Sequence, residues 1–541
     1  MRRWNGWGDD TYIYPLKGVA AAFLKRVVGP GTPPLDVSLD TVAASVPNSR
    51  LPAHPLVNTN PEQRVRHARG QSLPDWIAMR GGHALTFPDG VAYPSTDGQV
   101  RELIAYAVGA GARLIPYGGG TSVVGHINVL PGDSPVLTVD LSRLSSLRRF
   151  DETSQLATFG AGITGPDLEA FLRARGFTLG HFPQSFELST LGGWIVTRSC
   201  GQQSLGYGRI ERPFAGGRLE SPAGAVVLPA FPASAAGPDL REAVLGSEGR
   251  LGILTEATVR VTRLPKLERF HAAFFPSFEQ GKLAVREIMQ APVPLSMLRL
   301  STAEETEATL AMAGHEQLIH WLKRLMQLRR VRDQRCMLLL GATGSKKAVR
   351  FAVGESLAIV RKHGGVHVGR TFGNEWRKTR FLTPYLRNTL WEAGYAIDTL
   401  ETATQWSNIQ RIIAGVDAAL RHGLEDVGER VLAFSHLSHM YPSGSSIYTT
   451  YMYRIPADGD TDETLRRWRV LKVGATQAIV GAGATITHQH GIGTDHLAYL
   501  LAEKGRLGMT ALRDLCRRFD PGGMMNPGKL CDQTTDAHDG A

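Results

Sequence analysis

Residues 116–125, PYGGGTSVVG, are the most informative stretch of this 541-residue chain. Three consecutive glycines follow an apolar, strand-like run, so their amide N–H groups are unobstructed and the backbone can approach a pyrophosphate closely. Thr121 and Ser122 add two hydroxyl groups beside them. A Walker-type phosphate loop is excluded because no Gly-Lys-Ser or Gly-Lys-Thr follows. The stretch therefore predicts a phosphate-binding loop or, taken by itself, a flexible turn.

Two further loops of small and hydroxyl-bearing residues follow the first. They are PQSFELSTLGGWIVTRSCGQQSLGYG at 183–208 and GSEGRLG at 246–252. Three such loops in one segment indicate a site that wraps an extended dinucleotide. Residues 160–165, GAGITG, also spell GxGxxG, but Pro166 follows directly, and the acidic partner expected about 20 positions on would be Glu187, which has no second parallel strand before it. This motif is predicted to be a turn that starts a helix.

Composition and charge place the chain among globular enzymes. Apolar residues make up 43% of the chain and charged residues 20%, which excludes disordered and fibrous proteins. A chain of this length is expected to form two or three domains. Its net charge of +10 favours anionic ligands. The basic residues are spread along the chain and resemble no nucleic-acid module, so we expect no nucleic-acid partner.

The cysteines and the N-terminus bear on the compartment. Cys200, Cys336, Cys516 and Cys531 show neither CxxC nor Cys/His spacing, which indicates no disulfide framework and no thiolate metal site. The first ten residues lack the apolar core of a secretory signal, and no run reaches the ~18 apolar residues of a membrane span. We therefore expect a cytoplasmic setting.

The pattern of the chain divides it into four segments. Residues 1–78 are predicted to be helical or irregular, and residues 79–263 carry an α+β pattern that ends at Leu264-Pro265. Residues 264–463 form a second, α/β domain, with helices predicted over 278–290, 318–330 and 402–422 and strands over 335–344 and 446–455. Residues 464–541 are predicted to contain two helices that flank GATITHQHGIG.

The three loops, in this order, resemble those of the vanillyl-alcohol-oxidase-type flavoproteins. Within that superfamily the chain resembles the alkyldihydroxyacetonephosphate synthase family, through RWNGWGDD (3–10), the loops above, YPSGSSIY (441–448) and THQHGIG (487–493). The resemblance implies an α+β fold. Its parts are a two-part FAD-binding domain of the vanillyl-alcohol-oxidase/PCMH type (79–263), an α/β cap domain (264–463) and a helical C-terminal segment (464–541) that completes the site.

The resemblance also implies a cofactor, FAD, and its contacts. The loop glycines have no His or Cys among them to which the flavin could be attached, so noncovalent FAD is expected, with His126 just beyond the loop as the alternative attachment point. Carried over by position, the FAD contacts are Pro116, Tyr117, Gly118, Gly119, Gly120, Thr121, Ser122, Gln184, Ser185, Ser189, Thr190, Gly193, Thr197, Arg198, Ser199, Glu248, Gly249, Gly252, Ile253 and Leu254.

The activity that the resemblance implies is a transfer in ether-lipid synthesis. The acyl group of acyl-dihydroxyacetone phosphate is exchanged for a fatty alcohol without net redox, with flavin N5 as a covalent electron sink. Such a reaction needs a proton shuttle, a cation for the phosphate and an apolar tunnel for the chain. Arg387 and Arg299 match the family's substrate-binding arginines. A guanidinium fork suits phosphate, although either could be an ion-paired structural residue.

Four residues stand at the family's catalytic positions, and three of them match the family. Tyr448 matches the catalytic tyrosine, although a half-buried strand tyrosine is the structural alternative. His488 and His490 match two members of a histidine triplet, and in an extended segment both would point to the same side. Gln489 stands where the family has the middle histidine. Since glutamine cannot titrate, any proton transfer at that position is lost.

Two alternatives remain open. The D-2-hydroxy-acid dehydrogenases of the same superfamily, which act on lactate, glycolate or 2-hydroxyglutarate, have a Glu-His-Gly-Ile-Gly block and paired metal-binding histidines. This chain has His436 and His439, but Ile447 or Tyr448 holds the downstream ligand position and Gln489 replaces the glutamate. We therefore expect no metal site and favour the synthase. The other alternative is an FAD-binding protein without activity.

The expected partner is a small lipid or phosphorylated substrate. Residues 318–330 carry an apolar helical stripe beside basic residues, which suits an anionic lipid surface or ordinary packing on the core. A peripheral membrane contact and a homodimer are thus left open.

Overall fold

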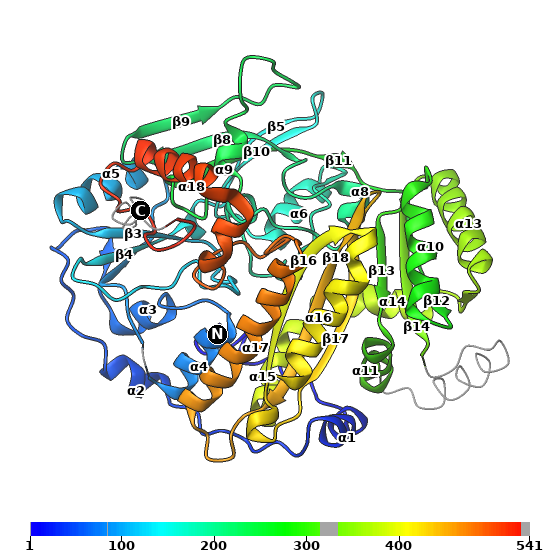
Figure 1. The fold of residues 1–541 in the computed structure, drawn as a ribbon. Coiled ribbons are helices and arrows are strands. Elements are labelled where there is room, and N and C mark those ends of the chain that lie inside the picture. The colour runs from blue at the N-terminus through cyan, green and yellow to red at the C-terminus, as the bar shows by residue number, and fades with distance from the viewer. Residues whose placement is uncertain (1, 84, 314–333, 532–541) are drawn as a thin grey trace.

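The computed structural model describes residues 2–83, 85–313 and 334–531. The predicted helix over 318–330 lies outside these ranges. Three larger sheets and the helices that cover them form most of the molecule (Figure 1). A fourth sheet has only two strands, the antiparallel pair β7 (Phe177–Thr178) and β11 (Thr262–Arg263). The predicted four-part division of the chain stays a prediction.

A four-stranded sheet carries the first glycine loop. Its order is β1 (Val57–Asn58), β2 (Gly90–Ala92), β4 (Val136–Asp140) and β3 (Arg113–Tyr117), and β2, β4 and β3 run parallel. The loop begins where β3 ends. The helix α5 (Asp97–Gly109) starts at the cap Thr96, whose side chain accepts from Gln99 N, and buries Val100, Leu103 and Ala107 at helical spacing.

A five-stranded antiparallel sheet packs on the other side of α5. Its order is β5 (Leu147–Asp151), β6 (Leu156–Gly160), β10 (Ile253–Arg260), β8 (Phe214–Ser221) and β9 (Gly224–Leu228). The GAGITG motif lies after β6, and Thr164 caps the helix α6 (Gly165–Arg173). The predicted turn and helix start are confirmed. A Rossmann site is excluded because β6 pairs antiparallel with both neighbours.

A seven-stranded antiparallel sheet, the cap sheet, forms the second half. Its strand order is β15 (Val366–His367), β12 (Leu267–Phe275), β14 (Cys336–Gly344), β13 (Met297–Ser301), β17 (Leu432–Tyr441), β18 (Gly444–Arg454) and β16 (Tyr395–Gln405). The strands predicted over 335–344 and 446–455 and the helix over 278–290 are confirmed. The helix predicted over 402–422 is wrong in its first part, because β16 continues to Gln405 and α16 (Ile409–His422) begins only after a 3-10 turn.

The two faces of the cap sheet differ in what covers them. One face packs against α10 (Phe278–Gln290), α13 (Lys346–Lys362), α16 and α17 (Thr461–Gly481), which Figure 1 shows over the sheet. Tyr451 and Tyr453 lie in that core, whereas Thr450 and Met452 line a cavity on the opposite face. Since side chains alternate along a strand, Tyr448 shares the cavity face.

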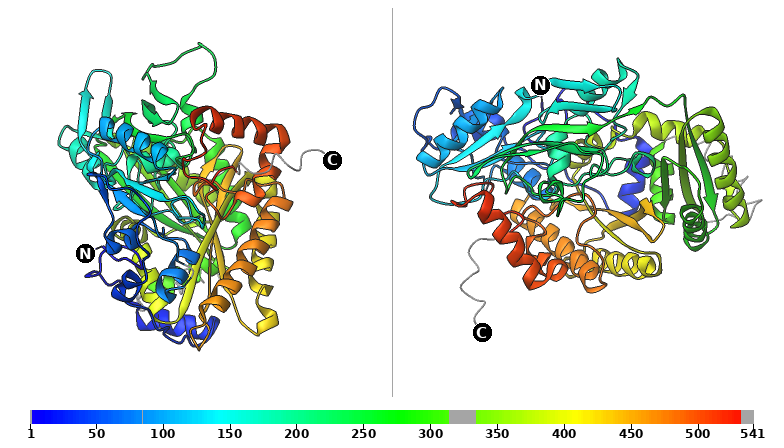
Figure 2. Two further views of the ribbon diagram at one scale, coloured as in Figure 1. Left: turned by 90° about the vertical axis from the view of Figure 1, so that its left-hand side faces the viewer. Right: turned by 90° about the horizontal axis from the view of Figure 1, so that it is seen from above.

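The remaining helices surround these sheets. The C-terminal helices α17 and α18 (Leu500–Phe519) lie along one side of the molecule in both views of Figure 2. None of the described helices combines the length and apolar composition of a membrane span. The other helices are α1 (Gly18–Val27), α2 (Leu39–Ala44), α3 (Pro61–Arg66), α4 (Leu73–Gly81), α7 (Leu191–Val196), α8 (Ser204–Tyr207), α9 (Arg241–Val244), α11 (Ala303–Ala313), α14 (Thr371–Thr379) and α15 (Thr383–Glu392).

Candidate active site

A cavity of about 610 Å³ lies between the glycine loop and the cap sheet. Its polar end is lined by the three loops that the sequence singles out. Its apolar end follows the open face of the cap sheet and reaches α11 and α14. The apolar side chains there include Met297, Met312, Met337, Leu339, Phe372, Trp376, Ile397, Phe434 and Met452.

The glycine loop has no room for side chains. A Cβ at Gly119 would lie 1.9 Å from the carbonyl oxygen of Leu188, and one at Gly118 would lie 2.4 Å from Thr190 Oγ1. Both neighbours belong to the second loop, so Gly119 packs against the backbone of that loop and Gly118 packs against its Thr190 side chain. This cradle is what a pyrophosphate-binding site requires.

The N-terminal segment, Arg2 together with RWNGWGDD, ties this loop to helix α15. Arg2 donates to the carbonyl of Gly119. Trp7 is buried, lines the cavity and exchanges two hydrogen bonds with Asn388 of α15, at 3.0 and 2.9 Å. The first residues of the chain therefore hold both sides of the cavity together.

Tyr448 lies on the cavity face of β18 between two strands. It pairs with Glu401 of β16 on one side and His436 of β17 on the other. Its ring stacks on His436 at a centroid distance of 5.2 Å and meets His490 edge-on at 5.7 Å. Burial raises the pKa of Tyr448 to about 12, so the phenol keeps its proton at neutral pH.

A buried glutamate shapes the histidine segment. Glu401 accepts from the backbone N–H groups of His488 (2.6 Å), Gln489 (3.1 Å) and His490 (2.9 Å) and from the hydroxyl of Thr487 (2.5 Å). Burial alone would raise the pKa of Glu401, but the two histidines and these donors hold it at about 2. Sequence patterns do not predict the role of Glu401, because its only signal is an acidic residue within a strand-like run.

The histidine segment is a loop, so the prediction that His488 and His490 point to the same side is wrong. Three successive N–H groups that converge on one carboxylate require a bend, which an extended strand does not provide. Gln489 and His490 line the cavity, but His488 is not among its lining residues. Burial lowers the pKa of His490, which favours a neutral imidazole.

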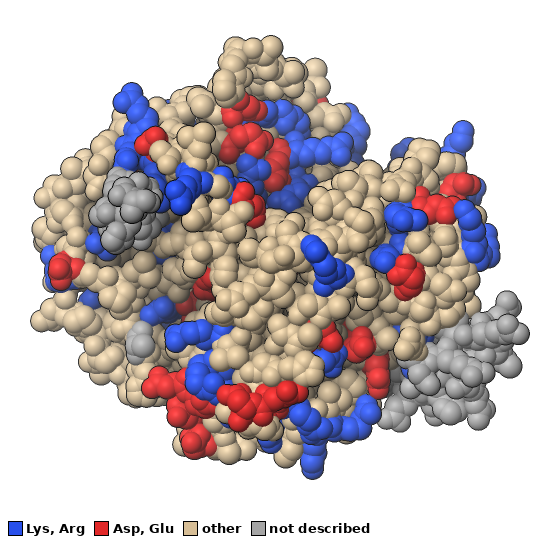
Figure 3. Space-filling model, viewed as in Figure 1, with Lys and Arg blue, Asp and Glu red and all other residues tan. Residues whose placement is uncertain are grey.

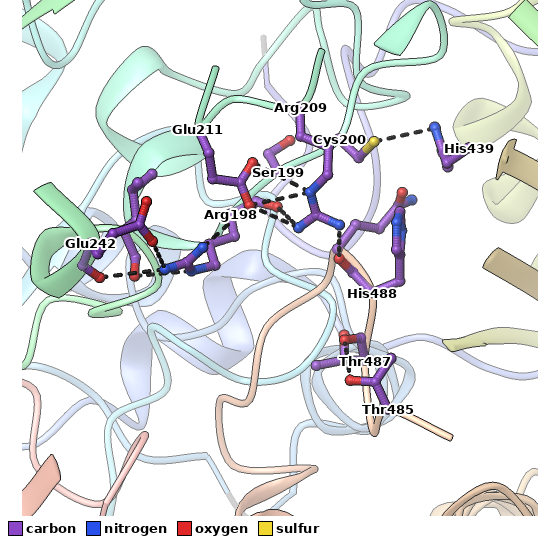
Figure 4. A network of polar contacts seen from close by, with 12 residues as sticks. Arg198, Ser199, Cys200, Arg209, Glu211, Glu242, His439, Thr485, Thr487 and His488 are labelled. Carbon is purple, nitrogen blue, oxygen red and sulfur yellow. Dashed lines mark hydrogen bonds and ion pairs between the residues drawn. The ribbon is translucent and has the colours of Figure 1, made fainter. Parts of the chain in front are cut away.

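His488 belongs to a network behind the cavity (Figure 4). Its Nε2 lies 2.6 Å from the hydroxyl of Tyr441, and its ring stacks on His439. Its carbonyl accepts from Arg209 at 2.7 Å. Burial, with Arg209 nearby, lowers the pKa of His488 to about 4. The residue therefore supports the loop from behind.

The two predicted substrate arginines differ in their partners. Arg387 of α15 donates from Nη1 to the carbonyl of Gln71 at 2.8 Å, and its guanidinium lies 4.4 Å from the Trp76 ring centroid. Its Nη2 is buried and has no hydrogen-bond partner among the described residues. Arg299 instead pairs with Glu305 at 2.7 Å. Both line the cavity, but only Arg387 lacks a carboxylate at this distance.

Two family models match the chain. One, described as an FAD binding domain, covers residues 88–227, and the other, described as the C-terminal domain of FAD linked oxidases, covers residues 264–530. The chain belongs to the FAD-linked oxidase family that includes the alkyldihydroxyacetonephosphate synthases. Its cofactor is FAD, and the predicted fold is confirmed.

The relatives of this flavoprotein include synthases and, at lower identity, dehydrogenases. An alkyldihydroxyacetonephosphate synthase of Dictyostelium discoideum is 28% identical over 98% of this chain and 93% of its own. A solved structure of an alkyldihydroxyacetonephosphate synthase superposes with a TM-score of 0.83 at 26% identity, over 98% of this chain and 99% of that one. A mitochondrial D-lactate dehydrogenase of Arabidopsis thaliana is 23% identical over 83% of this chain and 74% of its own.

The residues predicted to contact FAD in this flavoprotein line the cavity, with two differences. Arg198 extends to the surface, where Nη2 pairs with Glu242 at 2.6 Å. Ile253 is fully buried in the core between the two N-terminal sheets. Both follow the loop pattern in sequence, but their side chains face away from the cavity.

Glu248 and His126 make contacts of their own at the polar end. Glu248 accepts from the N–H groups of Ile492 (2.6 Å) and Gly493 (2.9 Å), so it anchors the segment that follows the histidines. His126 Nδ1 lies 2.9 Å from Ser122 Oγ, and its Nε2 lies 3.1 Å from the Glu248 carboxylate. Two buried glutamates therefore hold successive parts of the 487–493 loop, Glu401 its first half and Glu248 its second.

The histidines considered as metal ligands do not converge. His436 Nδ1 lies 2.9 Å from Glu305 and 3.3 Å from the guanidinium of Arg299, which would repel a cation. His439 Nδ1 instead lies 3.0 Å from Ser204 Oγ. Within the described ranges, no three His, Cys, Asp or Glu side chains are grouped to hold a metal ion.

Proposed function

We propose that this flavoprotein exchanges the acyl group of acyl-dihydroxyacetone phosphate for a long-chain alcohol, without net redox. The observation that carries this proposal is the cavity itself. The glycine loop, Tyr448 and the apolar wall of the cap sheet all line this one cavity. Arg387 lines it too, and its buried Nη2 has no hydrogen-bond partner among the described residues. The Dictyostelium synthase matches 98% of this chain at 28% identity, whereas the Arabidopsis D-lactate dehydrogenase matches 83% of it at 23% identity.

The chain supplies the proton chemistry. When bound, FAD supplies an electron sink for the substrate carbon. Tyr448 offers a phenol proton at Oη, and the neutral imidazole of His490 can accept one. The pair can therefore take a proton from the carbon that carries the acyloxy group and return it after the exchange.

The two ends of the cavity orient the substrate. We assign the phosphate to Arg387, whose Nη2 is the unused donor. Burial lowers the pKa of this guanidinium, an effect that a bound anion would offset. The fatty chain lies along the apolar wall, where each methylene buried contributes about 0.8 kcal/mol.

The test uses an alcohol labelled with ¹⁸O. The FAD-bound protein is incubated with acyl-dihydroxyacetone phosphate and [¹⁸O]hexadecanol, and the products are analysed by mass spectrometry. We expect an ether that keeps the label and an unlabelled fatty acid. D-lactate and D-2-hydroxyglutarate are offered separately with an artificial electron acceptor. Turnover of these acids together with the absence of labelled ether would reject the proposal in favour of the dehydrogenase.

The assignment of the phosphate to Arg387 makes a prediction about KM. In Arg387→Met we expect KM for the acylated phosphate substrate to rise about 100-fold, because a charged hydrogen bond worth about 2–3 kcal/mol is lost. The control is the same substrate without its phosphate, whose binding should be equal in both proteins. An equal loss with and without the phosphate would place the role of Arg387 elsewhere.

Gln489 limits the proton chemistry of this chain. Its Oε1 is buried without a hydrogen-bond partner among the described residues, and it lines the cavity beside His490. If the pocket otherwise suits the synthase reaction, Gln489→His should raise kcat about tenfold by adding a group that titrates. Gln489→Asn is the matched control. An unchanged kcat in the histidine variant would mean that the substrate differs from that of the synthases.

Noncovalent FAD is a further part of the proposal. His126 lies within contact distance of Ser122 and Glu248, so its ring nitrogens already have neighbours. We expect all of the flavin to pass into the supernatant when the protein is precipitated with acid, as measured by absorbance near 450 nm. Flavin that stays with the precipitated chain would contradict this prediction, and His126→Gln would then show whether this residue holds it.

The remaining parts of the proposal concern the setting. A cytoplasmic protein with a peripheral membrane contact fits a lipid substrate, and a homodimer stays open.

Lysines, arginines and acidic residues are interspersed on the face that Figure 3 shows. We retain the boundaries 1–78, 79–263, 264–463 and 464–541 as the proposed domains. Co-sedimentation with anionic and neutral vesicles tests the membrane contact.

A further inference from the structure

The last described residues form a clasp over the FAD site. The C-terminal clasp, residues 520–531, runs from the end of α18 back to β3, where Asn526 N donates to the carbonyl of Leu114 at 2.7 Å. The Asn526 side chain donates to the carbonyls of Glu248 (2.6 Å) and His126 (3.0 Å). Asn526 also lines the cavity. The clasp therefore holds two of the segments that surround the polar end.

Two cysteines meet where the clasp begins and ends. Cys516 lies on the last turn of α18 and Cys531 lies at the other end, and their Sγ atoms are 3.3 Å apart. Both side chains are fully buried. The other two cysteines have different neighbours, since Cys200 contacts His439 and Cys336 contacts the carbonyl of Gln334.

We propose that Cys516 and Cys531 are a modification site: a dithiol that a hydroperoxide oxidises to a disulfide, which locks the clasp around bound FAD. The sulfur of Cys531 attacks the peroxide, so that an S–O bond forms, the O–O bond breaks and water leaves after protonation. Cys516 then attacks the sulfenic sulfur, so that the S–S bond forms and a second water leaves. Two thiols and one hydrogen peroxide thus give one disulfide and two waters.

The surroundings of the pair favour this order of events. The hydrogen bond between the two sulfurs lowers the pKa of Cys531 and raises that of Cys516. Arg250, whose guanidinium is buried, also lowers the pKa of Cys531. The more acidic thiol is the better first target of the peroxide. Since both sulfurs are buried, the oxidant reaches them when the clasp opens locally.

The disulfide would act on cofactor retention. It closes the clasp covalently. Two hydrogen bonds already hold the clasp in place: Arg250 donates to the carbonyl of Met525 within the clasp, and Lys529 of the clasp donates to the carbonyl of Asn128. A closed clasp opens less often, so bound FAD escapes more slowly. This effect does not depend on which substrate the enzyme uses.

The first test is chemical. The FAD-bound protein is treated with hydrogen peroxide, alkylated and digested with trypsin without reduction. We expect a linked pair of peptides, residues 514–517 (DLCR) and 530–541 (LCDQTTDAHDGA), that separates on reduction. Cys336→Ser is the matched control and should give the same linked pair. Alkylated or sulfonated single peptides without the linked pair would overturn the proposal.

The second test measures FAD release by flavin fluorescence after dilution into urea below the unfolding range. We expect oxidation to slow release at least about fivefold and reduction to reverse the effect. Cys516→Ser and Cys531→Ser should each abolish the difference between oxidised and reduced protein. Equal release rates in the oxidised and reduced wild-type protein would overturn the proposed lock, and so would a peroxide effect that persists in both variants.

Discussion

Tyr448→Phe is expected to lower kcat about 10³-fold and to leave FAD content and KM within about twofold. The substitution removes only a hydroxyl, because the ring keeps its stack on His436 and its edge contact with His490. A loss of about 10³ in rate corresponds to about 4 kcal/mol, within the range of general acid–base catalysis. Steady-state kinetics and a flavin spectrum of the variant check both parts.

The same strand supplies the control for this prediction. Tyr453 lies on the opposite face of β18 and donates to the carbonyl of Thr464 at 3.1 Å. Tyr453→Phe should cost about 1 kcal/mol of unfolding free energy without changing kcat by more than about twofold. If Tyr448→Phe lost no more activity than Tyr453→Phe, Tyr448 would be a structural strand residue and the proton would move elsewhere.

Glu401→Gln is expected to lower kcat about 100-fold and the unfolding free energy by about 2–3 kcal/mol. The variant keeps the shape of the side chain, but an amide offers one acceptor oxygen where the carboxylate offers two. Four donors converge on Glu401. The single amide oxygen cannot accept from all of them, and each buried donor left without an acceptor lowers the unfolding free energy. The 487–493 loop would then hold His490 less firmly against Tyr448.

A pH profile separates this positioning role from a purely structural one. Burial lowers the pKa of His490, whereas the negative charge of Glu401 raises it. Loss of the Glu401 carboxylate therefore lowers the pKa of His490 further. Because the neutral imidazole is the proposed base, the acid limb of kcat should move to lower pH in Glu401→Gln. Glu429→Gln, which weakens an ion pair with Arg454 away from the cavity, should cost stability alone. An acid limb at the wild-type position in Glu401→Gln would contradict the role assigned to Glu401.

Local sequence patterns predicted much of the fold. The triple glycine after β3 predicted a backbone cradle, and the packing of Gly119 against Leu188 explains why no other residue fits. Alternation along β18 separates Tyr448 from Tyr451 and Tyr453, but the sequence alone could not show which face is open. The end of β16 at Gln405 has no local signal, because TATQW (402–406) contains no strong strand breaker and pairing with β18 decides the boundary.

The site was less predictable because it depends on contacts between distant segments. Glu401 lies almost 90 positions from the histidines that it holds, and no spacing rule connects them. The sequence predicts equivalent places for His488 and His490, yet the bend that Glu401 imposes leaves His490 in the cavity and turns His488 towards Tyr441. Arg387 and Arg299 also looked alike in sequence, and only their partners distinguish them.

The electron balance of a single turnover tests the central claim most directly. The FAD-bound protein is mixed anaerobically with acyl-dihydroxyacetone phosphate, a long-chain alcohol and an artificial electron acceptor. Fatty acid, ether and reduced acceptor are then counted together. We predict one fatty acid and one ether per turnover with no reduction of the acceptor. Stoichiometric reduction of the acceptor without ether would contradict the proposed exchange and identify the protein as an oxidoreductase.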